Sequence, residues 1–187
     1  YIIEGKDRDN FKNSGILPNK KIAPFRQLPV LDVDGKIFAQ TGAIARFCGK
    51  LSGLYPKDDD LAAARIDQVI EVAQDINYLF TLSSRDKEKE KLKLARKILA
   101  TKHLPKYFNF LENLIKENDN SLFFVGENIS IADLAIWRLL GWFESGIIDG
   151  VPTNILETYE NLKKMRNEIY KHPKVNDWMI KTYGKVI

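Results

Sequence analysis

The spacing of hydrophobic positions changes once along the chain, and the change predicts two domains. Residues 1–56 combine short apolar stretches with one helical stretch, whereas from residue 60 onward apolar side chains recur every three or four positions. Short apolar stretches bounded by turn residues are typical of strands, and the three- and four-residue spacing is typical of amphipathic helices. We therefore expect a small α/β domain over residues 1–56 and an all-helical domain over residues 57–187.

Within the first domain, the pattern predicts a hairpin followed by a helix. Val30–Val33 and Lys36–Ala39 are short apolar stretches on either side of Asp34 and Gly35. An Asp-Gly pair is a strong signal for a two-residue turn, because both turn positions need a positive φ. Over residues 41–51 the spacing becomes helical. The face that this helix is expected to bury carries Ile44, Phe47, Cys48 and Leu51.

The second domain is predicted to consist of helices only. At the start of one of them, Ser130 is placed to accept from the amide three positions on, while Asp133 accepts from the amide of Ser130. Asp133 is therefore interpreted as a structural capping residue and not as a catalytic acid. The expected helical ranges are 62–80, 87–100, 104–116, 130–143, about 155–170, and 175–182.

Composition and charge exclude several classes of protein. The 29 basic and 25 acidic side chains are interspersed, so we expect no nucleic-acid partner, which would need a one-signed basic face. No apolar run approaches the roughly 18 residues of a membrane span, and no signal-peptide core is present, so no membrane partner is expected. The single cysteine, Cys48, excludes an internal disulfide and fits a reducing compartment, which predicts a cytoplasmic location.

Other chemistries lack their motifs. His103 and His172 stand far apart without a ligand cluster, so no metal site is expected. The chain has no Cys-x-x-Cys pair for dithiol exchange. Cys48, on the predicted apolar face of its helix, is expected to pack there and not to react.

The residues around Pro29 form the most informative pattern. Pro29 stands immediately before an apolar strand, where a proline is allowed because the first residue need not donate to the ladder. If the Leu28–Pro29 bond is cis, the chain turns sharply there and the backbone amide and carbonyl of Leu28 face outward. An extended peptide could pair with those groups like an added strand. Thr41, as the predicted N-cap of the next helix, would leave free amides that favour a carboxylate.

The order of these features resembles that of a known family. Residues 27–31, the Asp34 and Gly35 turn, Gln40 and Thr41 are similar to the thioredoxin-like domain of cytosolic glutathione transferases. Residues 53–56 resemble the family's joint between domains, and residues 124–133 resemble the capping motif of its helical domain. The resemblance covers essentially the whole chain and is closest to the sigma class and its alpha, mu and pi relatives. It implies a thioredoxin-like α/β domain, incomplete here, followed by an all-α helical bundle.

The resemblance also implies an activity and a glutathione site. The expected reaction is transfer of the glutathione thiolate to small hydrophobic electrophiles, as in detoxification. Gln40 and Thr41 would hold the γ-glutamyl carboxylate, and Leu28, ahead of Pro29, would pair its backbone with the cysteinyl unit. Because this pairing needs Leu28 turned outward, a cis Leu28–Pro29 bond is predicted. A non-catalytic binding or structural role, and a glutathione-dependent isomerase, are the alternatives.

Further site residues follow from the resemblance. Gln27 and Lys20 would reach the peptide and its glycyl carboxylate, although the adjacent Lys21 could take the lysine's role, and either lysine could be a solvated surface residue. Asp75 matches an acidic residue that related classes send across a dimer interface to the γ-glutamyl ammonium, or it is an exposed helix carboxylate. A homodimer is expected, with Phe25 as an aromatic anchor in the partner or as a cover of its own domain.

The second-substrate pocket is expected to be apolar. Tyr78 and Phe80 are candidates for the pocket but are interpreted first as core residues.

The chain departs from the family pattern in three places. Arg26 stands where the family usually has Gly, so the backbone there must tolerate a side chain. The loop expected at residues 9–22 is several residues longer than usual. Residues 1–3 look like the second strand of the domain, so the residue that activates the thiol is expected in a missing N-terminal segment.

Overall fold

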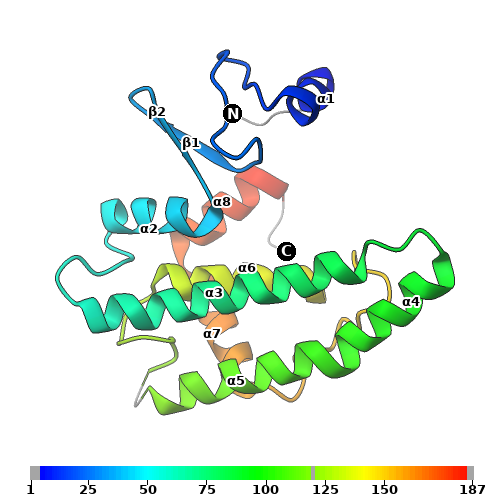
Figure 1. Cartoon of the computed structure of the whole chain (residues 1–187). Coiled ribbons are helices and arrows are strands. Elements are labelled where there is room, and N and C mark those ends of the chain that lie inside the picture. Colours follow the sequence, from blue (N-terminus) through cyan, green and yellow to red (C-terminus); the bar gives the residue numbers. More distant parts are fainter. Residues whose placement is uncertain (1–4, 119–120, 185–187) are drawn as a thin grey trace. The chain divides into compact units, whose positions relative to one another are not determined.

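The computed structural model describes residues 5–118 and 121–184, so the strand expected at residues 1–3 lies outside the described residues. The chain divides into two compact units, Tyr1–Gly53 and Leu54–Ile187, whereas the sequence pattern placed the division after residue 56. The first unit holds α1 (Gly5–Ser14), β1 (Val30–Val33), β2 (Lys36–Ala39) and α2 (Thr41–Ser52) (Figure 1).

The hairpin of the first unit has the predicted strands and turn. Strands β1 and β2 are antiparallel, and Val33 pairs with Lys36 next to the turn. Asp34 and Gly35 have φ values of 48° and 86°, so both turn positions are left-handed, as this turn requires. The hairpin prediction is confirmed.

The two faces of the hairpin contact different elements, because successive strand residues point to opposite sides. On one side, Ile37 packs against a small core made by Phe11, Leu17 and Ala23. On the other side, the rings of Phe38 and Phe47 of α2 lie edge to face with centroids 5.2 Å apart. The hairpin is therefore the middle layer of the first unit.

Helix α1 corrects the expectation of a long loop at residues 9–22. The helix continues to Ser14, and Gly15 ends it with a φ of 71° while its amide donates to the carbonyl of Phe11 over 2.7 Å. Phe11 is 5% exposed, so one apolar residue anchors an otherwise polar helix. A helix is predicted from hydrophobic periodicity only where several apolar residues recur at helical spacing, and α1 has too few of them.

Where the structure describes the second unit, its regular structure is all helical. Its elements are α3 (Asp60–Ser83), α4 (Lys89–Ile98), the π-helical turn η1 (Leu99–His103), α5 (Leu104–Glu117), α6 (Ile131–Glu144), α7 (Glu160–Lys171) and α8 (Pro173–Tyr183). Helix α3 contacts α6 and the α4–η1–α5 segment, and α7 contacts α5, α6 and α8. The described residues contain no helix that is both long and apolar enough to span a membrane.

The break predicted between residues 100 and 104 is instead a change of helix type. The backbone stays helical from α4 through η1 into α5, with Leu104 donating to the carbonyl of Leu99. Pro105 has no amide to donate, so a regular α-helical ladder would have a gap at this point. The wider π turn just before Pro105 lets the helix continue without ending.

The core of the second unit confirms the predicted apolar faces. Phe80 packs against Trp142, with ring centroids 4.3 Å apart, whereas Tyr78 is 58% exposed, so the core assignment was wrong for Tyr78. Tyr78 follows the buried Ile76 by two positions and therefore points away from it. The buried apolar residues of α3 are Ile66, Val69, Ile70, Ala73 and Ile76.

The predicted capping box at the start of α6 is present and buried. Asp133 is 0% exposed and accepts from the amide and hydroxyl of Ser130 over 2.7 and 2.6 Å, and from the amide of Phe124 over 2.8 Å. Burial raises the pKa of Asp133, and the hydrogen bonds from Ser130 and Phe124 oppose that rise. The interpretation of Asp133 as a structural residue is therefore supported by every contact it makes.

Candidate functional site

The register of the hairpin brings two separate segments of the sequence together. Val30, the first residue of β1, pairs with Ala39, the last residue of β2. Leu28 and Pro29 precede Val30, and Gln40 follows Ala39, so these residues meet at the end of the hairpin opposite the turn. We call this end of the hairpin, made by Leu28, Pro29, Gln40 and Thr41, the open end.

The chain before β1 presents exposed backbone at the open end. The Leu28–Pro29 bond is cis, as predicted. Leu28 is 48% exposed, and within the described residues no hydrogen bond engages its amide or carbonyl. Those two groups are therefore available to an extended peptide, which would pair with them as a strand does. Gln27 is also exposed and leads into this segment.

Arg26 has a backbone conformation that favours glycine. Its φ is 50°, a left-handed backbone that side chains disfavour, and its amide donates to the carbonyl of Ala23 over 2.9 Å. The arginine stem crosses Gly15 so closely that a Cβ on Gly15 would lie 2.5 Å from Cγ of Arg26. The sequence pattern did not assign Gly15 a role; the signal was a glycine directly after a polar stretch, the usual place for a helix C-cap.

The N-terminus of α2 corrects the assignment of its cap. Gln40, with φ 79° and ψ 123°, is the N-cap, and Thr41 is the first helical residue. The prediction of Thr41 as N-cap was wrong, because the left-handed Gln40 turns the chain one residue earlier. No side chain caps this helix, so the amides of Thr41, Gly42 and Ala43 face outward at its positive end. Such an end is a favourable seat for a carboxylate.

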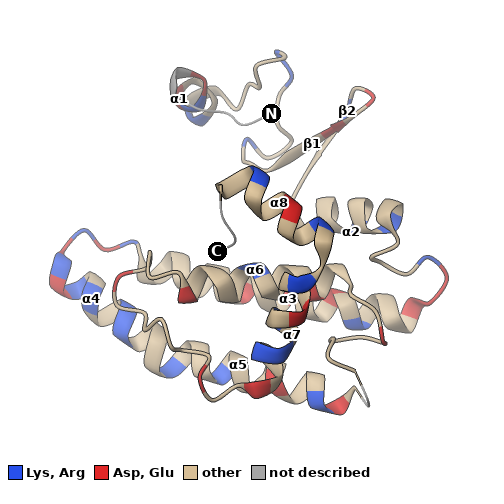
Figure 2. Ribbon diagram, turned by 180° about the vertical axis from the view of Figure 1, so that it is seen from behind, with Lys and Arg blue, Asp and Glu red and all other residues tan. Residues whose placement is uncertain are grey.

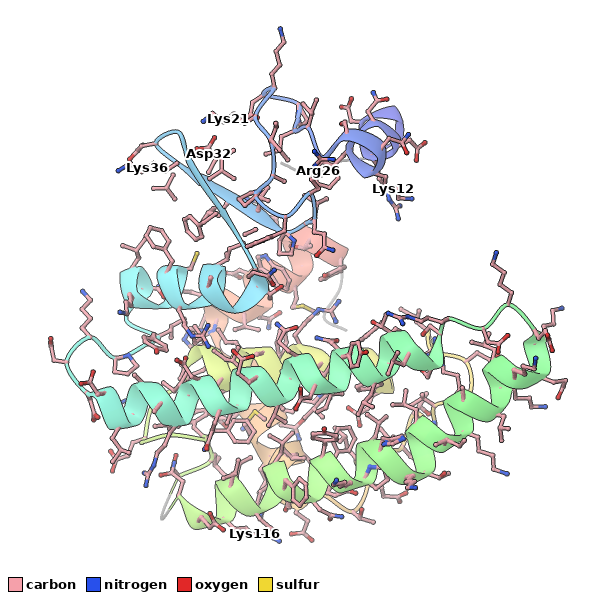
Figure 3. All side chains as sticks on the ribbon, in the orientation of Figure 1. Lys12, Lys21, Arg26, Asp32, Lys36 and Lys116 are labelled. Atoms are coloured by element: carbon pink, nitrogen blue, oxygen red, sulfur yellow. The ribbon has the colours of Figure 1, made fainter. Side chains whose placement is uncertain are left out.

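The two neighbouring lysines have different environments. Nζ of Lys21 lies 3.0 Å from a carboxylate oxygen of Asp32 and donates to the carbonyl of Gly35 over 3.0 Å, at the turn end of the hairpin (Figure 3). This hydrogen bond from Lys21 lowers the pKa of Asp32. Lys20 is exposed with a φ of 66°, and no hydrogen bond or ion pair joins its side chain to a described residue. The side chain of Lys21 is thus held at the turn of the hairpin, whereas no contact holds the side chain of Lys20 at the open end.

Three other residues belong to another unit or differ from expectation. Asp75 belongs to the second unit, where it is exposed on α3. Cys48 is exposed and Leu51 is 73% exposed, so the face predicted for α2 was wrong at these two positions, whereas Ile44 and Phe47 are half-buried. The buried residue of α2 is Gly49, because the narrow two-stranded hairpin covers only one strip of the helix.

Glu112 is a buried polar residue that the sequence pattern did not single out. It is 6% exposed and accepts from the amides of Asn161 and Leu162, each over 3.0 Å, at the start of α7. Its carboxylate therefore caps one helix from the side of another. An acidic residue within the apolar stretch of α5 was the available signal. Within the described residues, no cluster of His, Cys, Asp and Glu could hold a metal ion.

Comparison with known proteins decides the family. Residues 74–182 match the family described as "Glutathione S-transferase, C-terminal domain". Glutathione S-transferase 1 of Ascaris suum is 30% identical over 166 residues, which are 86% of this chain and 76% of that protein. The chain belongs to the glutathione S-transferase family. A glutathione S-transferase of Plasmodium yoelii yoelii is 33% identical over 141 residues, and the match covers 75% of this chain and 64% of that protein, less than two thirds of its length.

Solved structures of glutathione S-transferases and prostaglandin synthases share the fold. Prostaglandin synthase D of Nilaparvata lugens is 27% identical with a TM-score of 0.75, over 86% of this chain and 76% of that one. The monomeric glutathione S-transferase Na-GST-3 of Necator americanus is 26% identical with a TM-score of 0.73, over 94% and 81% of the two chains. The predicted fold class, a small α/β unit followed by an all-α unit, is confirmed.

Proposed function

We propose that the protein binds glutathione at the open end and transfers its thiolate to small hydrophobic electrophiles. The observation that carries this proposal is the uncapped N-terminus of α2 beside the unpaired backbone of Leu28. An uncapped helix end takes a carboxylate, and an unpaired strand-like residue takes an extended peptide. Glutathione has both features, a free carboxylate at its γ-glutamyl end and an extended peptide at its centre.

Each residue of the open end has a distinct part in this proposal. The amides at the start of α2, with the side chains of Gln40 and Thr41, hold the γ-glutamyl carboxylate. The backbone of Leu28 pairs with the cysteinyl unit, which sets the position of the sulfur. Gln27 contacts the peptide, and Lys20, whose ammonium has no partner among the described residues, reaches the glycyl carboxylate. Asp75 of a second copy binds the γ-glutamyl ammonium.

The proposed reaction is a substitution or addition at an electrophilic carbon. The thiol loses its proton, the thiolate forms a carbon–sulfur bond, and either a leaving group departs with its electron pair or the electrophile's π bond takes up the electrons. A thiolate is the reactive form, so a nearby hydrogen-bond donor that lowers the pKa of the thiol raises the rate. The residues named here bind and orient glutathione and are not assigned that activation.

The test is conjugation of glutathione to a chromogenic aryl halide, followed by absorbance, together with calorimetric binding of glutathione. Turnover that saturates with glutathione supports the transferase. Binding without turnover overturns the transferase and supports a non-catalytic member of the family. Absence of binding overturns the site itself.

A second candidate, a glutathione-dependent isomerase, is favoured by one observation. The 27% identical Nilaparvata lugens structure is that of a prostaglandin synthase D. We propose on this basis that the chain is closest to the sigma class. Isomerisation of a cyclic endoperoxide in the presence of glutathione, measured by product mass and chromatography, separates this activity from conjugation.

We also propose that the protein is a homodimer in which Phe25 enters the partner. Phe25 is 59% exposed, so it does not cover its own unit. A buried aromatic anchor commonly contributes 2 kcal/mol or more to an interface, so Phe25→Ala should shift sedimentation toward monomer. Ile22→Ala, which removes another exposed apolar side chain of the same unit, is the matched control. A monomeric wild-type protein would exclude the dimer, and an intact mutant dimer would exclude only the anchor.

A further inference from the structure

Basic residues are concentrated in one segment of an otherwise balanced chain. Over residues 91–106 the sequence has no acidic residue, although the whole chain has 25 of them and a net charge of only +4. In Figure 2 the colour of Lys and Arg recurs along α4. The six basic residues of this stretch are Lys91, Lys93, Arg96, Lys97, Lys102 and Lys106.

Helix α4 also exposes apolar side chains on the side that carries these lysines. Leu94 is 59% exposed and Ile98 is 42% exposed, four residues apart and therefore adjacent on the helix surface. The inward side of the helix is formed by other residues, since Leu99 is buried and Arg96 places its guanidinium 4.1 Å from the ring centroid of Phe80. We call the exposed surface made by Lys91, Lys93, Leu94, Lys97 and Ile98 the α4 outer face.

The charges of the α4 outer face are largely uncompensated. Lys91 makes an exposed ion pair with Glu88 over 2.9 Å, near the start of the helix. Lys93 and Lys97 are exposed, and no ion pair or side-chain hydrogen bond joins them to a described residue. A helix that faces only water usually alternates charges of both signs along its surface. From Lys91 onward, α4 instead has only basic charges together with two exposed aliphatic residues, and the exposed Glu90 in its first turn is the one acidic residue of the helix.

This combination distinguishes between two kinds of anionic partner. Nucleic acids are bound through phosphates and base edges, and an exposed Leu94 and Ile98 would add nothing to such contacts. An anionic bilayer uses both features, because ammonium groups contact lipid phosphates while aliphatic side chains enter the boundary of the acyl region. Lysine suits this position, since its long apolar stem lies against lipid while its charge stays in the headgroup layer.

We propose that the α4 outer face docks the protein reversibly on anionic lipid membranes. The helix lies parallel to the bilayer surface, with Leu94 and Ile98 toward the acyl chains and Lys91, Lys93 and Lys97 among the headgroups. Two aliphatic side chains are too few for stable insertion, so binding depends on the lysines and weakens with salt. The sequence-based expectation of no membrane partner concerned a spanning segment, whereas this contact is peripheral. The proposal is independent of the glutathione site.

The test is co-sedimentation of the protein with vesicles of phosphatidylcholine alone and of phosphatidylcholine mixed with phosphatidylserine. Binding is expected only to the mixed vesicles and should fall steeply as salt is raised. Because each lysine near an anionic surface contributes about fivefold in partitioning, Lys93→Gln with Lys97→Gln should weaken binding about 25-fold. Leu94→Ser with Ile98→Ser should also weaken it. Lys174→Gln with Lys181→Gln, an equal charge change on α8, is the matched control and should have little effect.

Several outcomes would overturn the proposal. Absence of binding, or equal binding to neutral vesicles, excludes an anionic-membrane site. If the lysine variant loses binding to single-stranded DNA while the Leu94 and Ile98 variant keeps it, the face is a nucleic-acid site. If the variants change the sedimentation coefficient instead, the face is a contact between copies of the chain. Glutathione affinity, measured by calorimetry on the same variants, should stay unchanged, so failure here is distinct from failure of the proposed function.

Discussion

Helices α2 and α6 both begin with amides that a helix cannot satisfy by itself, but only α6 supplies partners from nearby side chains. At α6, Ser130 and Asp133 form a complete capping box, and Asp133 also accepts from the amide of Phe124. At α2, Gln40 is the N-cap and makes no side-chain capping bond. The same type of helix end is thus closed in one unit and open in the other.

The two helix starts differ because one is buried and the other is exposed. The start of α6 is buried, so every donor there must be matched inside the protein or the fold loses stability. The start of α2 is exposed, so water satisfies its amides until a ligand replaces that water. A closed helix end serves stability, and an open one leaves room for binding.

The largest expected effect comes from breaking the closed end. Asp133→Ala removes the cap of α6 and leaves the buried amide of Phe124 without a partner. Lost capping and an unsatisfied buried donor together should lower the free energy of unfolding by about 2–4 kcal/mol. Urea denaturation followed by circular dichroism measures this change. A loss below about 0.5 kcal/mol, the level of an ordinary surface substitution, would show that the capping box does not stabilise the fold.

At the open end the expected effect falls on binding and not on stability. Gln40→Ala should weaken glutathione binding by about 1–3 kcal/mol, the usual loss for hydrogen bonds to a charged group, while the unfolding midpoint stays the same. Calorimetry measures the affinity, and Gln68→Ala on α3 is a control at another exposed glutamine. Unchanged affinity would remove Gln40 from the proposed site.

The burial of Asp133 should also make the stability of the fold depend on pH. The pKa of Asp133 is raised above its ordinary value of 3.8 by burial, so the folded protein holds this proton more tightly than the unfolded chain does. As the pH rises from 3.8 through the folded-state pKa, the contribution of Asp133 to the free energy of unfolding therefore falls. Asp133→Asn cannot titrate, so the stability of the wild type relative to this variant should decrease across that interval. A difference that grows with pH would show that the hydrogen bonds outweigh burial.

The smallest effect is expected at the turn end of the hairpin. Lys21→Ala removes the hydrogen bond that lowers the pKa of Asp32, so this pKa should rise toward its ordinary value. Because the pair is exposed, the unfolding midpoint should change little. Carbon-detected NMR titration of Asp32 measures the shift, and Lys36→Ala at the next strand provides a control for loss of a nearby charge. An unchanged pKa in Lys21→Ala would contradict the assigned contact.

Local patterns in the sequence were enough to predict several of these features. The turn at Asp34 and Gly35 and the capping box of Ser130 and Asp133 are both present. Each depends on residues at most three or four positions apart, so the chemistry that determines it can be seen directly in the sequence. The same holds for the apolar face of α3, where one spacing repeats over many turns.

Other features depend on contacts between residues that are distant in the sequence or on how whole elements pack, so local patterns could not predict them. The choice between Lys20 and Lys21 was open in the sequence, and Asp32, eleven residues after Lys21, commits Lys21 to the hairpin. Cys48 was expected to be buried, but which side of α2 meets the narrow hairpin depends on how the two pack. Gln40 is the N-cap because its backbone is left-handed. The pairing of Val30 with Ala39 places Gln40 at the open end beside Leu28. Periodicity shows which residues share a face, whereas packing selects the face that is buried and the polar groups that remain exposed.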